Sequence, residues 1–194
     1  MASKDSLVSV RQTFVARAEH YSRETSWVQS RKLISPLIPN GRPPRDGDLL
    51  LDLCSGTGAV SSYAQIRGWR VHAMDLTAPM LAQIASPAIV KLVGDATNAP
   101  FLDGSFDVVT MRQGMHYLDL DAALKEMLRL SRRSIALGHI TLWHDADKSV
   151  WADYFNVASP GRKHIFAPGD ISQAVKRAGG RVISETVRES REKF

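Results

Sequence analysis

Cysteine is almost absent from this chain, because Cys54 is the single one among 194 residues. One cysteine cannot form a disulfide within the chain, and such usage is typical of proteins from the reducing cytoplasm. Long hydrophobic runs are missing too, since no stretch reaches the roughly 18 apolar residues of a membrane-spanning helix. The first residues also lack the apolar centre of a signal peptide. We therefore expect a cytoplasmic protein without a membrane span.

Positively charged residues only slightly outnumber negatively charged ones. Lysine and arginine total 25 against 20 acidic residues, which gives a net charge of +5. The basic residues are interleaved with acids, as in residues 188–193, and they do not alternate with aromatic residues as in RNA-binding segments. This pattern is typical of a solvated mixed surface, so we expect no nucleic-acid partner. Internal repeats and low-complexity tracts are also lacking.

Residues 49–58, with the sequence Leu-Leu-Leu-Asp-Leu-Cys-Ser-Gly-Thr-Gly, are the most informative segment that is present. An apolar run meets an acid and then a glycine turn, and a helix-like stretch follows over 59–67. This order predicts a buried parallel strand whose carboxyl end faces a ligand. Gly56 and Gly58 allow the backbone to approach that ligand closely. Cys54 lies inside the turn without a partner motif, which favours a small packed residue over a nucleophile.

Acids also follow the next two predicted strands. Asp75 ends the strand 70–74, and Asp95 comes just after the strand 89–93. An acid about 20 residues beyond a glycine turn suits a pair of ribose hydroxyls. Asp95 can accept a hydrogen bond from an exocyclic amine. The glycine spacing itself does not suit a dinucleotide, because Ser61 occupies the third position, and this disfavours a nicotinamide oxidoreductase.

Strands and helices alternate along the chain, which predicts an α/β fold with a mostly parallel sheet and helices on both faces. A broken helical region over 6–34, with Val10, Phe14, Val15 and Ala18 on one face, leads into a Pro-rich connector over 35–48. We divide the chain into an N-terminal helical lid and linker (1–48) and a core (49–194). The further strands are predicted at 106–111, 134–141 and 181–187, and the further helices at 78–85, 120–128 (capped by Asp121) and 169–178.

These segments together resemble the class I S-adenosylmethionine-dependent methyltransferases, in particular the small-molecule branch that includes the quinone C-methyltransferases. The resemblance runs from about Tyr21 to about Arg181. It is carried by Leu-Asp-Leu-Cys-Ser-Gly-Thr-Gly, by Met-Asp-Leu-Thr-Ala-Pro-Met-Leu, and by the longer block from Gly94 to Val109. It implies a Rossmann-like fold with S-adenosyl-L-methionine as cofactor and S-adenosyl-L-homocysteine as product. Cys54 departs from the family pattern, because this position is often glycine.

The resemblance also implies which residues hold the cofactor. Asp52, Ser55, Gly56, Thr57 and Gly58 would surround its methionine part, and Asp75 would bind the ribose. The adenine would meet Leu76, Met80, Asp95 and Ala96, and Arg112 and Gln113 would close the site after the fourth strand.

Candidate catalytic groups are His116, His144 and Tyr21. His116 follows the fourth strand and could take a proton near neutral pH, although a packing role explains it equally well. His144 precedes Asp145 just beyond the fifth strand, and Tyr21 lies in the region that resembles a lid. His139 is interpreted as a core or pocket-wall residue. The spacing of these histidines matches no metal-binding motif, so no metal is expected.

Two segments suggest further contacts. The predicted irregular insert 142–167 carries Trp143, Trp151, Tyr154, Phe155, His164 and Phe166, which indicates either a lid over a flat acceptor or a small additional core. Few residues follow Val187, which leaves little room for the seventh strand usual in the family. An unpaired sixth strand would be an association site, and it predicts a homo- or hetero-oligomer formed through this edge.

The sequence thus predicts methyl transfer to a small-molecule acceptor by in-line displacement. It leaves open whether oxygen, nitrogen or carbon accepts the methyl group. Two alternatives remain: a protein of this fold that uses the cofactor for other chemistry, and a subunit of a heteromeric enzyme.

Overall fold

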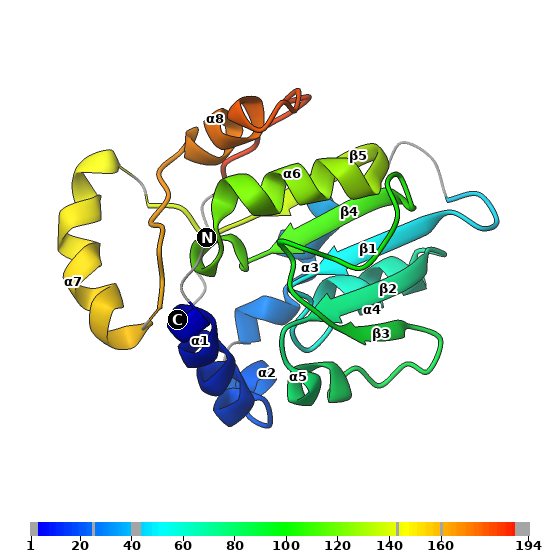
Figure 1. The fold of residues 1–194 in the computed structure, drawn as a ribbon, viewed down its shortest axis with the longest axis horizontal. Helices are drawn as coiled ribbons and strands as arrows, with labels where there is room; N and C mark the ends of the chain where they lie inside the picture. Colours follow the sequence, from blue (N-terminus) through cyan, green and yellow to red (C-terminus); the bar gives the residue numbers. More distant parts are fainter. Residues whose placement is uncertain (1–3, 25, 40–43, 143, 160, 189–194) are drawn as a thin grey trace.

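A five-stranded sheet forms the centre of the computed structural model, which describes residues 4–24, 26–39, 44–142, 144–159 and 161–188. All neighbouring strands pair in parallel, in the order β3-β2-β1-β4-β5 (Figure 1). This confirms the predicted α/β class. The strands are β1 (Leu49–Leu53), β2 (Arg70–Asp75), β3 (Val90–Val93), β4 (Phe106–Arg112) and β5 (Ser131–Gly138). The direction in which strands are added reverses between β1 and β4.

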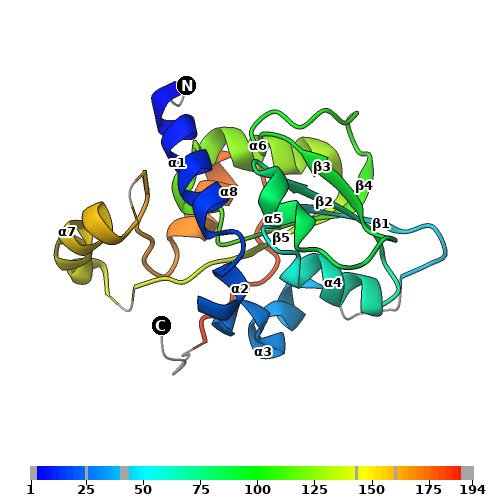
Figure 2. The same ribbon diagram turned by 90° about the horizontal axis from the view of Figure 1, so that it is seen from below.

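Helices cover both faces of the sheet (Figures 1 and 2). One face carries α3 (Arg31–Ile34), α4 (Ala59–Ile66) and α5 (Ala78–Ala82), and the other carries α6 (Leu120–Leu130) and α8 (Asp170–Arg177). Successive side chains of a strand point to opposite faces. Accordingly, Leu51 and Leu53 pack with the residues of α6 and α8, whereas Leu50 packs with those of α3, α4 and α5.

The N-terminal region is a broken series of helices whose first break lies at residues 18–20. It consists of α1 (Lys4–Arg17), α2 (Tyr21–Glu24), the 3₁₀ turn η1 (Ser26–Gln29), α3 and a second 3₁₀ turn, η2 (Ser35–Leu37). Val10 and Ala18 are buried as expected, but Val15 is 45% exposed, so its assignment to the buried face is wrong. Along α1 the side chain of Val15 lies 100° from that of Phe14 and therefore leaves the packed face.

Helix α6 begins two residues earlier than its predicted cap implied. The side chain of Asp119, rather than Asp121, accepts a hydrogen bond from the backbone N–H of Ala122 at 3.1 Å. Asp121 lies in the first turn, where a carboxylate still interacts favourably with the helix dipole.

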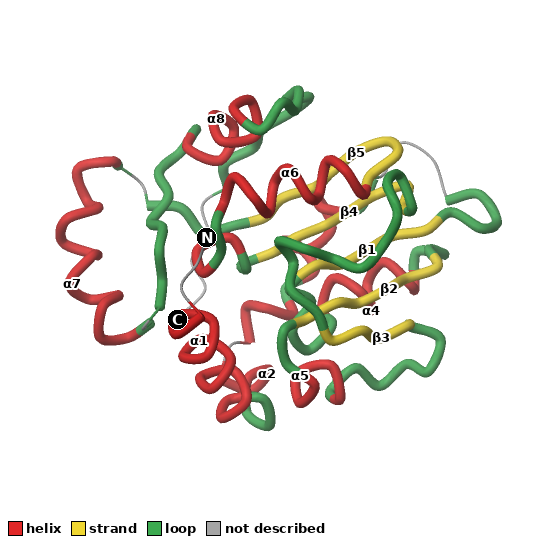
Figure 3. The backbone as a smooth tube through the Cα atoms, viewed as in Figure 1, coloured by secondary structure: helices red, strands yellow, loops and turns green. Residues whose placement is uncertain are grey.

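The C-terminal part differs most from the sequence-based expectation. Strand β5 begins and ends three residues before the predicted positions, and the insert contains a helix, α7 (Lys148–Ala158), preceded by the turn η4 (Asp145–Asp147). Figure 3 shows that the chain returns from α7 to α8 as a loop. Trp143 lies outside the described residues. No helix in the described ranges has both the length and the apolar character that are needed to cross a membrane.

The predicted sixth strand over 181–187 is not formed. A segment becomes a strand only when a neighbour satisfies its backbone groups, and none of the described residues pairs with this one in the sheet. Its side chains are also largely exposed, with Ile183 at 77%, and only Val182 packs against the core. Within the described chain, β5 is therefore the edge strand on this side, and no seventh strand is present.

Candidate active site

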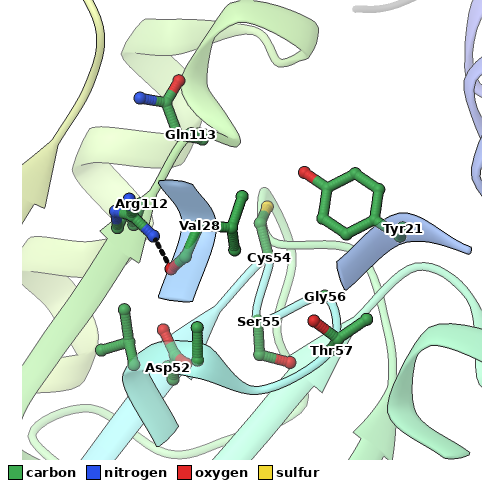
Figure 4. Close-up of a pocket in the computed structure, with 11 residues that line it drawn as sticks. Tyr21, Val28, Asp52, Cys54, Ser55, Gly56, Thr57, Arg112 and Gln113 are labelled. Carbon is green, nitrogen blue, oxygen red and sulfur yellow. Dashed lines mark hydrogen bonds between the residues drawn. The ribbon is translucent and has the colours of Figure 1, made fainter. Parts of the chain in front are cut away.

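A pocket lies at the carboxyl ends of β1 and β4, where the strand order reverses (Figure 4). This is the position at which open α/β sheets bind ligands. The pocket is lined by Tyr21, Val28, Asp52, Cys54, Ser55, Gly56, Thr57, Ala59, Val60, Arg112 and Gln113. Three separate parts of the chain thus meet here: the N-terminal helices, the glycine turn with the start of α4, and the end of β4.

The backbone around this pocket is strained at two positions. Cys54 and Gln113 have φ angles of 54° and 59°, and among the described residues they are the only non-glycine residues with positive φ. Each follows the last residue of a strand, β1 for Cys54 and β4 for Gln113, and both line the pocket. Left-handed conformations of this kind cost about 1–3 kcal/mol and cluster at functional sites. The strain therefore supports a ligand-binding role for this edge.

Asp52 ties the glycine turn to its neighbours and is only 1% exposed. One carboxylate oxygen accepts hydrogen bonds from the backbone N–H and the hydroxyl of Ser61, at 3.0 and 2.6 Å. The other accepts from the hydroxyl of Thr110 in β4, at 3.0 Å. Burial outweighs these bonds and raises the pKa of Asp52 to about 6. The side chain thus clamps β1, α4 and β4 together beneath the pocket.

Asp75, at the end of β2, holds the glycine turn from the other side. Its carboxylate accepts from the backbone N–H of Gly56 at 2.9 Å, and from the N–H and hydroxyl of Thr77 at 3.0 and 2.9 Å. Burial raises the pKa of Asp75 despite these bonds. A carboxylate has about four acceptor sites, so this one retains capacity for a further donor.

The remaining predicted cofactor residues do not line the pocket. They are Gly58, Leu76, Met80, Asp95 and Ala96, and Asp75 likewise lies outside this lining. Gly58 is needed for another reason, because its φ is 80° and a Cβ there would lie 2.6 Å from Cγ1 of Ile84. Asp95 accepts hydrogen bonds from the backbone N–H and the hydroxyl of Thr97, which fixes the turn after β3.

The N-terminal helices are attached to the pocket through Arg112. Its guanidinium donates to the backbone carbonyl of Val28 at 2.6 Å (Figure 4). It also donates to the carbonyl of Trp27 at 3.3 Å and lies over the Trp27 ring, 5.4 Å from the ring centre. Sequence reasoning missed Val28, Ala59 and Val60 as lining residues. For Ala59 and Val60 a signal was available, since they open the helix that follows the glycine turn.

The three predicted catalytic residues lie in different places. Tyr21 lines the pocket, and burial raises the pKa of its phenol, so the hydroxyl stays protonated at neutral pH. His116, in the 3₁₀ turn η3 (Met115–Tyr117), follows Gln113 by three residues and is 5% exposed. His144 is exposed, lies at the start of the insert, and does not line the pocket.

The cysteine and the acidic and histidine side chains were considered as a nucleophile and as metal ligands. Burial raises the pKa of the Cys54 thiol well above its usual value, which keeps it a protonated packing group. Within the described ranges, no three His, Cys, Asp or Glu side chains are grouped in a way that could hold a metal ion.

Comparisons with known proteins agree with this geometry. The family model described as "Methyltransferase domain" matches residues 51–134. Among curated proteins, the demethylmenaquinone methyltransferase of Mycolicibacterium gilvum is 39% identical over 119 residues, which cover 58% of this chain and 51% of the relative. The corresponding protein of Mycolicibacterium vanbaalenii is 44% identical with the same coverage. The chain thus spans about half the length of the curated relatives it matches.

Solved structures share the fold at low sequence identity. A possible histamine N-methyltransferase of Thermotoga maritima aligns over 86% of this chain and 79% of its own, with a TM-score of 0.66 and 19% identity. The putative methyltransferase in complex with the Trm112 activator of Haloferax volcanii aligns with the same TM-score at 20% identity, over 86% of this chain and 75% of the other.

Proposed function

We propose that this chain transfers a methyl group from S-adenosylmethionine to a small-molecule acceptor, because the methyltransferase domain model matches residues 51–134 and solved methyltransferases share its fold. The observation that carries the proposal is the strained pocket at the reversal point of the sheet, with Cys54 and Gln113 on its wall. The cofactor supplies a methyl group on a sulfonium, which is already activated for displacement. The protein's task is to bind, orient and exclude water.

The residues present fit this cofactor. Ser55 lines the pocket, and its buried hydroxyl has no hydrogen-bond partner among the described residues, although buried polar groups are normally paired. A ligand with polar ends would satisfy it. The Tyr21 hydroxyl is a second donor on the same wall, and Asp75 has acceptor capacity left for a ribose hydroxyl. Ser55, Tyr21 and Asp75 are thus the residues that we assign to cofactor binding.

For the acceptor, we propose a flat aromatic molecule of the kind that demethylmenaquinone represents. The names of the curated relatives support this class. A series of aromatic rings also leads away from the pocket. The rings of Tyr21 and Phe14 meet edge-on with their centres 6.1 Å apart, and those of Phe14 and Tyr117 meet edge-on with their centres 5.3 Å apart. Such rings suit an apolar, planar acceptor, because small-molecule sites are mostly apolar with a few polar groups that set orientation.

Calorimetry with the purified chain tests the cofactor assignment. We expect one-to-one binding of S-adenosylmethionine and S-adenosylhomocysteine at micromolar affinity and no binding of NADH. A folded sample that binds neither sulfur compound would refute the proposal. Formation of S-adenosylhomocysteine upon addition of reduced, short-chain demethylmenaquinone then tests the acceptor class, and its absence with a chain that binds the cofactor would refute that class.

A second candidate is a subunit of a heteromeric enzyme. It is favoured by β5, which is an edge strand within the described residues, and an unpaired edge offers backbone donors and acceptors to another chain. Light scattering of the purified chain tests association with itself. A stable monomer that forms S-adenosylhomocysteine unaided would show that activity requires neither a second copy of this chain nor a different partner subunit.

A further inference from the structure

Two histidines that follow neighbouring strands meet beside the proposed active site. His116 lies in η3 after β4, and His139 directly follows β5. Because Arg112 of β4 pairs with Gly138 of β5, both histidines lie just beyond the same edge of the sheet. Nδ1 of His116 and Nε2 of His139 are 2.7 Å apart, and the two rings meet edge-on with their centres 4.9 Å apart.

The second nitrogen of His139 determines which atoms carry the protons. Nδ1 of His139 is hydrogen-bonded to the backbone carbonyl of Ile140. A carbonyl only accepts, so Nδ1 must bear the hydrogen. In a neutral ring Nε2 of His139 then has a lone pair, and it must accept from Nδ1–H of His116. His116 is thereby left with a lone pair on Nε2, which takes part in no hydrogen bond within the described part of the chain.

Both rings are held neutral. Burial lowers the pKa of His139 to about 4 and that of His116 further still. The guanidinium of Arg162 also disfavours a charge on either ring, whereas the hydrogen bond to the carbonyl of Ile140 acts in the opposite direction on His139 without offsetting its burial. The tautomers that were deduced for neutral rings therefore apply at physiological pH.

The surroundings fix the pair in place and connect it to the pocket. The backbone carbonyl of His116 accepts from the N–H groups of Lys163 and His164, at 2.6 and 3.3 Å. Phe166 packs edge-on against His139 with ring centres 4.8 Å apart. On the other side, the centres of the Tyr117 and His116 rings are 4.1 Å apart. Tyr117 is the first of the aromatic rings that lead through Phe14 to Tyr21 at the pocket.

We propose that His116 and His139 form a relay in which His139, held by the carbonyl of Ile140, is the positioning residue that directs the lone pair of His116 Nε2 toward a hydroxyl of the acceptor. This inference rests on the proposed function and narrows it to acceptors with a phenolic or enolic hydroxyl. The acceptor gains a methyl group and loses one proton, whose bonding electrons stay on its oxygen. His116 Nε2 takes this proton while Nδ1–H passes its own proton to Nε2 of His139. The positive charge therefore ends on His139, whose pKa is the less depressed of the two and whose Nδ1–H is held by the carbonyl of Ile140.

The tautomers can be measured without any activity. In ¹⁵N-labelled protein at pH 7, long-range ¹H–¹⁵N spectra of the histidine rings should show His116 and His139 as neutral Nδ1–H tautomers. The ordinary Nε2–H form at His116 would overturn the relay, whether or not the chain transfers methyl groups. In His139→Phe, which keeps a ring but has no acceptor, His116 should change to the Nε2–H form.

Kinetics then test whether the arrangement matters for turnover of reduced demethylmenaquinone. His139→Phe should lower kcat by at least about tenfold, since a positioned base is worth about 10²–10⁴ in rate, while cofactor affinity stays within twofold. His139→Gln, whose amide can both accept and donate, should recover part of kcat. His72→Gln is the matched control, because His72 is a half-buried histidine of β2 outside the site.

Unchanged kcat in a folded His139→Phe variant would overturn the relay even if the tautomers are as expected. Failure of the wild-type chain to bind the cofactor in calorimetry would instead refute the proposed function, and the tautomer measurement would still decide the geometry of the pair.

Discussion

The side chain of Cys54 fills the space that a side chain at residue 114 would need. A Cβ built on Gly114 would lie 2.5 Å from Cβ and 2.7 Å from Sγ of Cys54. Cys54 itself adopts a left-handed φ of 54°, a conformation that glycine reaches without steric cost. The cysteine in the glycine turn after β1 and the glycine after β4 are therefore complementary, and together they determine how closely these two pocket walls approach.

This relationship predicts coupling between the two sites. Gly114→Ala should lower the free energy of unfolding by about 1–3 kcal/mol through overpacking. Cys54→Gly alone should change it by less than about 1 kcal/mol, because relief of strain offsets the loss of packing. The double variant should recover most of the loss, as measured by urea denaturation. Strictly additive effects would show that the two residues do not share this space.

Asp75→Ala should weaken cofactor binding by about 1–3 kcal/mol, since it removes a charged hydrogen-bond acceptor and releases the backbone N–H of Gly56. Calorimetry with S-adenosylhomocysteine measures the change. Asp121→Ala, at an exposed acid in α6, is the matched control and should leave affinity unchanged. Wild-type affinity in a folded Asp75→Ala protein would remove Asp75 from the site.

Asp52 should make stability depend on pH. Its pKa is raised from 3.8 to about 6 in the folded state, so its contribution is fully present below pH 3.8 and is lost as pH rises through 6. Relative to Asp52→Asn, which cannot ionise, the wild type should lose up to about 3 kcal/mol between pH 4 and 7, at about 1.4 kcal/mol per pKa unit. Urea midpoints of both proteins across this range give the difference. A difference independent of pH would contradict the raised pKa.

Arg112→Lys should loosen the lid rather than the core. A lysine cannot donate from two nitrogens to the carbonyls of Trp27 and Val28 or stack as a plane on the Trp27 ring. We expect faster protease cleavage around residues 21–30 and an affinity for S-adenosylhomocysteine that is about three- to tenfold lower. Arg67→Lys, at an exposed position beyond α4, controls for the substitution itself. Equal cleavage rates in the two variants would show that Arg112 does not fasten the lid.

Elements whose signals are local could be predicted from the amino-acid sequence alone. The strand–acid–glycine turn of residues 49–58 and the acids at 75 and 95 placed β1, β2 and β3, because a buried apolar run that ends in a turn residue is readable within about ten residues. The same locality explains the errors. The segment 181–187 has strand-like residues, but a strand also requires a paired neighbour, and the described chain provides none.

Contacts between side chains that are distant in the sequence became visible only in the folded chain. His116 and Arg112 were predicted as site residues from the sequence, but their partners were not. His116 contacts His139, 23 positions away, and Arg112 donates to carbonyls 84 and 85 positions earlier. The sequence placed Asp75 near a ribose, but not on the N–H of Gly56. The physical reason is that sequence periodicity reports which face of an element is buried, whereas hydrogen bonds between elements depend on strand order and register. Those are fixed only when the whole sheet assembles.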